Sequence, residues 1–177
     1  GFALSRLNRN EEAVQQLEHA LRLDPRMGQA HLNMALALNG LGRVEEAGEH
    51  LRAAARLQPD HFQIQNDLGD TLSRLGRPQE ALAAYREAVR LNPDFLPAVA
   101  SLGATLIDLD RKAEAYAFFE QAARRQKNPA GALHDIASRL MLHGYAPAGL
   151  ALSLKVIEWE PGHPLALNNA AWVMAVS

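Results

Sequence analysis

The sequence predicts an all-α protein built from stacked pairs of amphipathic helices, and three observations carry this prediction. The apolar pattern recurs every 34 residues along the 177-residue chain, which is a period of helical-repeat proteins. Glycines mark a tight turn inside the recurring unit, as at Gly42 and Gly76, and prolines close it, as at Pro59 and Pro93. Columns of small apolar residues also alternate with columns of large ones, as closely packed helices require.

The columns set the register of the repeat. One column of small residues runs through Ala13, Ala47, Ala81, Ala115 and Gly149. A column of large apolar residues runs through Leu4, Leu38, Leu72, Leu106, Leu140 and Met174. Two helices that cross at close range need a residue without bulk at the crossing and large residues beside it. The agreement of several columns therefore makes the register much stronger than one motif would.

The unit at residues 62–95 shows the pattern best. Its characteristic positions are Leu68, Gly69, Leu72, Gly76, Ala81, Tyr85, Ala88, Leu91 and Pro93. In type and spacing these residues match the tetratricopeptide repeat, so the chain resembles that family. The resemblance implies a right-handed superhelix, or solenoid, of stacked helix pairs, and a binding scaffold whose partner the sequence does not name.

In this register the whole chain, residues 1–177, is one array. It comprises a partial repeat at 1–27, repeats at 28–61 and 62–95, an irregular repeat at 96–129, a divergent repeat at 130–163 and a lone helix of a partial repeat at 164–177. We expect the partial repeat at 1–27 to begin partway through its first helix and to continue with a second helix over residues 10–23. The array would then contain eleven helices.

Local signals support the individual helices. Glu45 and Glu46 suit the positive N-terminal end of a helix dipole, and Pro59 ends that helix. Pro78 falls in the first turn of the next second helix, where a missing N–H costs nothing.

The fourth unit departs from the pattern. Asp110 replaces the turn glycine, Arg125 replaces the leucine found at Leu57, and the closing proline has moved to Pro129. These changes predict a second helix about half a turn longer than the others. They also predict that the weakest cooperative boundary lies at residues 124–132.

Composition excludes several classes of function. Eighteen Lys and Arg stand against 20 Asp and Glu, for a formal charge of −2, so no excess of positive charge draws the chain to nucleic acid or to anionic lipid. The longest apolar run, residues 170–176, is far shorter than the ~20 residues of a membrane-spanning helix. We expect no nucleic-acid partner and no membrane insertion. The absence of cysteine suits the cytoplasm and the periplasm equally, and we expect a cytoplasmic protein.

Catalytic motifs are absent from the sequence. It contains no glycine-rich phosphate loop, HExxH pair, GxSxG elbow or dinucleotide fingerprint. The seven histidines include no pair at i, i+4 that would place two imidazoles on one helical face for a metal ion. We therefore expect no catalytic residue, no cofactor and no metal in this chain, which would then not be an enzyme.

The family resemblance implies a concave groove lined by the first helix of each pair, where an extended peptide segment of a partner protein would bind. The groove residues carried over from the family are Asn33, Leu36, Asn66, Asp67, Asp70, Arg74, Ser101, Asp108, Asp135, Ser138, Asn169 and Trp172. One column among them comprises Asn33, Asp67, Ser101, Asp135 and Asn169. It resembles the asparagine ladder of the nucleocytoplasmic O-linked N-acetylglucosamine transferase, whose side chains hold a peptide backbone. Alternatively, the column serves local hydrogen bonds between helices.

The charges of the groove narrow the class of ligand. The groove lacks the Lys and Arg clamp that would hold an acidic peptide C-terminus. If Arg74 pairs with Asp70 four residues earlier, the remaining aspartates favour a neutral or weakly basic segment.

Two further hypotheses concern the protein around this chain. The first, an alternative to the scaffold, is that the chain is the substrate-recruiting arm of a larger enzyme such as a glycosyltransferase. Apolar residues of the last helix, among them Leu165, Leu167, Trp172 and Met174, predict self-association through the terminal helices, since exposed apolar surface usually marks an interface.

Overall fold

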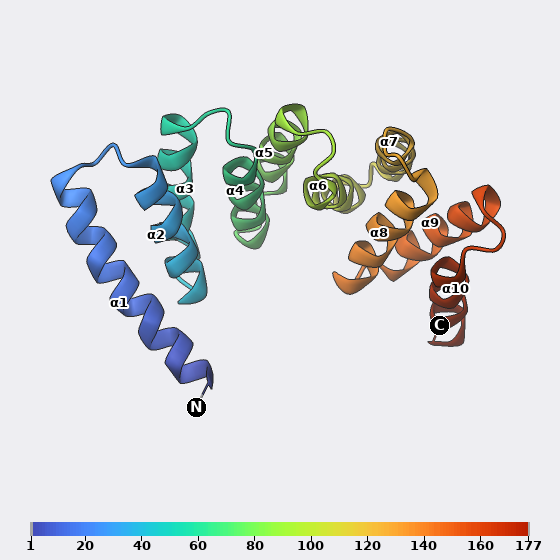
Figure 1. The fold of residues 1–177 in the computed structure, drawn as a ribbon, viewed down its shortest axis with the longest axis horizontal. Coiled ribbons are helices and arrows are strands. Elements are labelled where there is room, and N and C mark those ends of the chain that lie inside the picture. Colours follow the sequence, from blue (N-terminus) through green and yellow to red (C-terminus); the bar gives the residue numbers. More distant parts are fainter. Residues whose placement is uncertain (1, 177) are drawn as a thin grey trace. The chain divides into compact units, whose positions relative to one another are not determined.

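The computed structural model describes the backbone of residues 2–176 and the side chains of residues 9–175, and this part of the chain is helical without any strand (Figure 1). Its helices are α1 (Phe2–Leu23), α2 (Gly28–Gly40), α3 (Val44–Leu57), α4 (Phe62–Arg74), α5 (Pro78–Leu91), α6 (Leu96–Asp108), α7 (Lys112–Arg124), α8 (Pro129–Leu142), α9 (Ala146–Trp159) and α10 (Pro164–Val176). The predicted all-α class is confirmed.

The chain folds into two compact units, which we call unit 1 (Gly1–Leu91) and unit 2 (Asn92–Ser177). In unit 1 each of the helices α1 to α4 packs against the next helix along the chain. In unit 2 α8 packs against both α6 and α7, while α9 packs against α8 and α10. Each unit is therefore a stack of helix pairs in which sequence neighbours supply the packing, as expected of a helical repeat.

A residue with positive φ makes the turn inside each of four helix pairs. These residues are Gly42 (φ 77°), Gly76 (φ 68°), Asp110 (φ 58°) and Gly144 (φ 90°). Asp110 adopts a conformation that is costly for most residues with a Cβ but is tolerated best by Asn and Asp. Its turn keeps the hydrogen bonds of the glycine turns, because the N–H of Arg111 donates to the Leu106 carbonyl as that of Arg77 does to Leu72.

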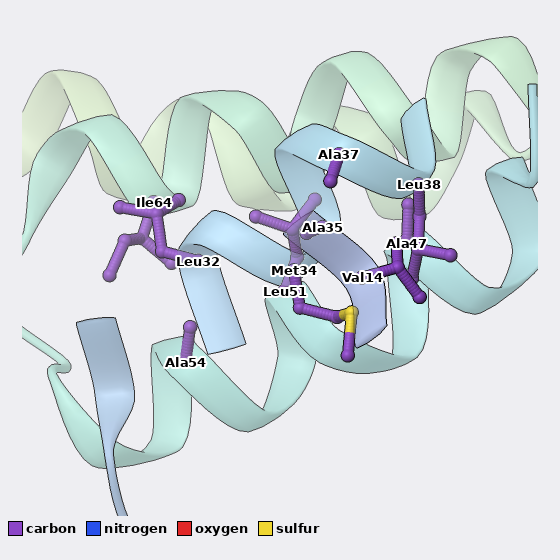
Figure 2. Close-up of a cluster of buried hydrophobic side chains, with 10 residues drawn as sticks. All are labelled: Val14, Leu32, Met34, Ala35, Ala37, Leu38, Ala47, Leu51, Ala54 and Ile64. Carbon is purple, nitrogen blue, oxygen red and sulfur yellow. The ribbon is translucent and has the colours of Figure 1, made fainter. Parts of the chain in front are cut away.

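The small and large columns meet in the core as the register requires. Ala47, Ala81 and Ala115 are completely buried, and Leu38, Leu72, Leu106 and Leu140 are at most 3% exposed. Figure 2 shows the cluster in unit 1, where Val14 of α1 points toward Leu38 and Ala47. This apolar core holds α1, α2, α3 and α4 together and leaves other faces of the same helices for function.

Two expectations about the helices are wrong. Helix α1 runs unbroken from Phe2 to Leu23, so the described residues contain ten helices rather than eleven. The turn position there holds Asn8, and α1 contains neither Gly nor Pro to break it. Helix α7 is not lengthened either, because its 13 residues compare with 14 in α3 and α5.

The segment between α7 and α8 forms specific side-chain hydrogen bonds. Oδ1 of Asn128 accepts from the Gly131 N–H at 3.0 Å and so caps α8, while Nε2 of Gln126 donates to Asp94 Oδ1 at 2.8 Å. These contacts and the packing of α8 on α6 and α7 bridge the junction predicted to be loose. The division between the two compact units falls between Leu91 and Asn92, and the weakest cooperative boundary at residues 124–132 stays a prediction.

Candidate functional site

The candidate groove residues lie on the first helix of each pair, and each unit carries its own set. Unit 1 places Asn33 and Leu36 on α2, and Asn66, Asp67, Asp70 and Arg74 on α4. Unit 2 places Ser101 and Asp108 on α6, Asp135 and Ser138 on α8, and Asn169 and Trp172 on α10.

The α2 candidates are open to solvent. Asn33 is exposed, and its Oδ1 accepts from Gln29 Nε2 of the same helix at 3.1 Å. Leu36 is 51% exposed. Since a surface bond four residues away in the same helix is weak, Asn33 can exchange it for a bond to a ligand.

The α4 candidates are partly used by the fold. Asn66 is buried and donates from Nδ2 to Oδ2 of Asp70 at 3.2 Å. The hydroxyl of Tyr85, on α5, donates to the other oxygen of Asp70 at 2.7 Å. Half-buried Asp67 has a raised pKa, first because burial disfavours its charge and then because Asp70 is near. A hydrogen-bond donor or a cation of a ligand would stabilise the charged form of Asp67.

Arg74 does not follow the predicted pairing with Asp70. Its Nη1 donates to Oδ1 of Asn39 at 2.9 Å, and Nδ2 of Asn39 donates to Oγ1 of Thr71 at 3.2 Å. The Asp70 carboxylate is held by Asn66 and Tyr85 instead. Arg74 therefore joins a polar relay that ties α2 to α4.

Unit 2 shows the same division between open and engaged candidates. Asp135 is exposed and Ser101 is half-buried. Oδ2 of Asp108 accepts from the Tyr145 hydroxyl, at the start of α9, at 2.6 Å. Burial, and then this bond, raise the pKa of Tyr145. Sequence reasoning missed the tyrosines that hold Asp70 and Asp108, because Tyr85 and Tyr145 occupy different columns of the repeat and show no shared signal.

Helices α8 and α10 are joined through the predicted ladder. Nδ2 of Asn169 donates to Oγ of Ser138 at 3.2 Å, and this hydroxyl lies 3.4 Å from Nε2 of His134. At Asn169 the ladder thus makes a local hydrogen bond between helices, as the alternative interpretation required. Trp172 is 56% exposed and adds an aromatic surface beside it.

The described residues offer neither a metal site nor a membrane-spanning helix. Over that part of the chain, no three His, Asp or Glu side chains come together in a way that would hold a metal ion. None of the helices there has the length and apolar character needed to cross a bilayer.

Solved structures with the same fold include two that are described as TPR proteins. YrrB, described as a TPR protein with an unusual peptide-binding site, is 25% identical over 93% of this chain and 85% of its own, with a TM-score of 0.65. MamA is 19% identical over 86% of this chain and 89% of its own, with a TM-score of 0.67. TTC0263, a thermophilic TPR protein in Thermus thermophilus, is 22% identical over 97% of this chain and 94% of its own, with a TM-score of 0.60.

The likenesses to MamA and TTC0263, at 19% and 22% identity, show only that the fold is shared. No curated protein matches the chain. Family models described as tetratricopeptide repeats match residues 1–27, 26–94 and 72–140. The successive models overlap, and the turns and the small and large columns described above have the spacing of this repeat. The chain belongs to the tetratricopeptide repeat family.

Proposed function

We propose that an extended peptide segment of a partner protein binds along the first helices of this interaction scaffold. The observation that carries the proposal is the row of short polar side chains at equivalent positions of successive first helices. Asn33 and Asp67 represent it in unit 1, and Ser101 and Asp135 in unit 2. The likeness to YrrB, whose description names a peptide-binding site, supports the same ligand class.

The chemistry of the row suits a peptide backbone. Backbone N–H and C=O groups recur along an extended chain, and amide, hydroxyl and carboxylate side chains offer partners to both. Such contacts hold a segment without selecting its sequence. Selectivity would then come from exposed apolar neighbours that differ between helices, among them Leu36 and Trp172.

The charges favour a neutral or weakly basic segment. Asp70 and Asp108 already accept hydrogen bonds from tyrosines. Exposed Asp135 and half-buried Asp67, whose pKa is raised by burial and by Asp70, remain as the acidic positions of the row. An acidic segment would add repulsion at both.

A triple variant, Asn33→Ala, Asp67→Ala and Asp135→Ala, tests the proposal. We expect it to melt like the wild type but to capture its partner less well from an extract of the source organism, at ~0.5–1.5 kcal/mol per neutral hydrogen bond lost and more for a charged one. The matched control replaces three exposed glutamines of α1, α5 and α7 by alanine: Gln16, Gln79 and Gln121. Normal capture by the triple variant, or its unfolding, would place the binding surface elsewhere.

We further propose that the chain itself carries no catalysis. As a recruiting arm of a larger enzyme, it would use the same row of residues to hold the substrate protein. Adding the purified chain in excess to that enzyme should then compete for substrate, and the triple variant should compete less.

The exposed side of α10 supports self-association as a second mode of interaction. Leu167 and Met174 are 45% and 59% exposed. Their counterparts one repeat earlier, Leu133 and Leu140, are at most 1% exposed. We propose that a helix of a second copy covers this surface. Light scattering over a concentration series should show association that Leu167→Ser with Met174→Ser abolishes, and a wild type that stays monomeric at high concentration would contradict it.

A further inference from the structure

Unit 1 contains a pocket between α1, α2 and the start of α3. Its volume is about 270 Å³. Val14, Met34 and Leu38 supply apolar lining, and Glu18 and Glu46 supply carboxylates. Met34 and Leu38 lie on a different face of α2 from Asn33 and Leu36, because residues of a helix are ~100° apart around its axis. The pocket is therefore separate from the proposed peptide surface.

In the next repeat an arginine of the chain itself stands at the position that corresponds to Glu18. Arg52, 34 residues after Glu18, places Nη2 3.9 Å from Oε2 of Glu80. Glu80 also accepts from Nη2 of Arg77 at 2.7 Å. Two arginines thus share one carboxylate there, and the guanidinium of Arg52 comes from the position that corresponds to Glu18.

The pocket repeats this arrangement with one charge reversed. Arg43 and Glu46 form the same pair as Arg77 and Glu80, with Nη2 of Arg43 2.6 Å from Oε2 of Glu46. The third member is Glu18 instead of an arginine. Arg22, which also lines the pocket, has Arg56 as its counterpart, so its charge is unchanged. Compared with the equivalent positions one repeat later, the pocket therefore has one cation fewer and one carboxylate more.

His50 completes the wall without supplying that cation. Burial, and then neighbouring His31, lower its pKa. The imidazole therefore carries little positive charge at neutral pH.

We propose that this pocket binds an arginine side chain of a partner protein. The aliphatic stem lies against Val14, Met34 and Leu38, and the guanidinium lies between Glu18 and Glu46, where Arg52 stands in the next repeat. Arginine fits better than lysine because its planar fork can donate to two carboxylates at once. The site is a second contact point for a partner, outside the row of first-helix residues.

The test is a titration of the whole chain with N-acetyl-arginine amide, followed through the methyl resonances of Met34 and Leu38. N-acetyl-citrulline amide, which has nearly the same shape without the charge, is the matched probe. We expect the arginine probe to move these resonances and the citrulline probe to bind at least about twofold more weakly, as for a partly exposed ion pair.

Variants of Glu18 sharpen the test. Glu18→Gln should weaken arginine binding about two- to fivefold, and Glu18→Arg should abolish it, because the chain then supplies its own guanidinium at this position, as it does with Arg52 in the next repeat. The exposed Glu12→Gln on α1 is the control and should bind like the wild type, as should the triple groove variant. Thermal melts establish that each variant is folded, and Glu18→Gln alone decides the result if Glu18→Arg does not fold.

Three results would overturn the proposal. One is equal binding of the arginine and citrulline probes. Another is binding that Glu18→Gln leaves unchanged. The third is the absence of any shift at Met34 and Leu38 up to the solubility limit of the arginine probe.

Discussion

The ring of Phe119 occupies the space directly above Gly103. A Cβ built on Gly103 would overlap Cζ and Cε1 of this completely buried ring. Replacing Gly103 by alanine must therefore move the ring or the backbone of α6. We expect Gly103→Ala to destabilise the chain by ~1–3 kcal/mol, the cost of overpacking a core, measured as a lower urea midpoint.

Gly162→Ala is the matched control in the same unit, since no atom lies within 4 Å of a Cβ built there. Its effect should stay within ~0.5 kcal/mol. Adding Phe119→Leu to Gly103→Ala should cost less than the sum of the two single changes, because the smaller side chain relieves the clash. If Gly103→Ala is as stable as the wild type, the packing of α7 on α6 differs from that described.

The helix pairs could be predicted because small and large residues must alternate where helices cross. Gly103 stands in a column of small residues, and the ring that fills its space comes from the following helix, α7. The turn at Asp110 follows the same logic, since the register requires a positive φ even without glycine. The unbroken helix α1 was not predicted, because the repeat register places a turn at Asn8. No residue near Asn8 stops a helix, so the helix continues through it.

The hydrogen-bond partners of the site residues were harder to predict, because many of these partners lie on other helices. Spacing along α4 paired Arg74 with Asp70, but Arg74 reaches Asn39 of α2 and Asp70 is held by Tyr85 of α5. A periodic pattern gives the face on which a residue lies and does not tell which side chain of a neighbouring helix comes within bonding distance. The pocket proposed to bind arginine likewise could not be predicted. The charge reversal at Glu18 becomes informative only when the structure places its counterpart, Arg52, beside Glu80.

The bond between Tyr145 and Asp108 should stabilise unit 2 in a pH-dependent way. Tyr145→Phe removes a donor to a carboxylate, which costs ~1.5–3 kcal/mol when buried and less here because Asp108 is exposed. Burial and Asp108 raise the pKa of Tyr145, so the native state favours the neutral hydroxyl. Its stabilising effect is complete below the unfolded pKa of ~10 and is lost as the pH rises above that value.

Urea midpoints at neutral and at alkaline pH measure this effect. The wild type should lose its advantage over Tyr145→Phe as the pH rises. Tyr116→Phe on α7 is the control, because the described residues show no hydrogen bond to the Tyr116 hydroxyl. A constant difference between the wild type and Tyr145→Phe would argue against the bond.

The relay from Arg74 through Asn39 to Thr71 should contribute to the stability of unit 1. Asn39→Leu leaves the buried Thr71 hydroxyl and the Arg74 guanidinium without this partner. We expect a loss of ~1–3 kcal/mol, the cost of a buried polar group left unpaired, in urea unfolding. Asn33→Ala on the exposed face of α2 should be near neutral, and equal effects of the two changes would mean that the relay adds nothing.

The histidine pairs predict how stability responds to mild acid. Nδ1 of His31 lies 2.9 Å from Nδ1 of His50, and Nε2 of His31 lies 3.1 Å from the Pro25 carbonyl. Since a carbonyl only accepts, Nε2 of His31 must donate, and in the neutral pair its Nδ1 accepts from His50. In unit 2 the rings of His134 and His163 have centroids 5.1 Å apart, and both side chains are buried.

Burial, and then the neighbouring imidazole, lower the pKa of His50 and of His134, and nearby acids such as Glu49 and Asp135 oppose these shifts more weakly. A lowered pKa means that the native state favours the neutral ring, so the full stability is present above the unfolded pKa of ~6.5 and is lost as the pH falls below it. We expect the urea midpoint to fall between about pH 7 and pH 5.5. His50→Gln with His134→Gln should flatten this dependence, and His143→Gln, at an exposed position, should leave it unchanged. A wild-type midpoint that is constant or rises over this range would show that the rings are charged in the folded protein.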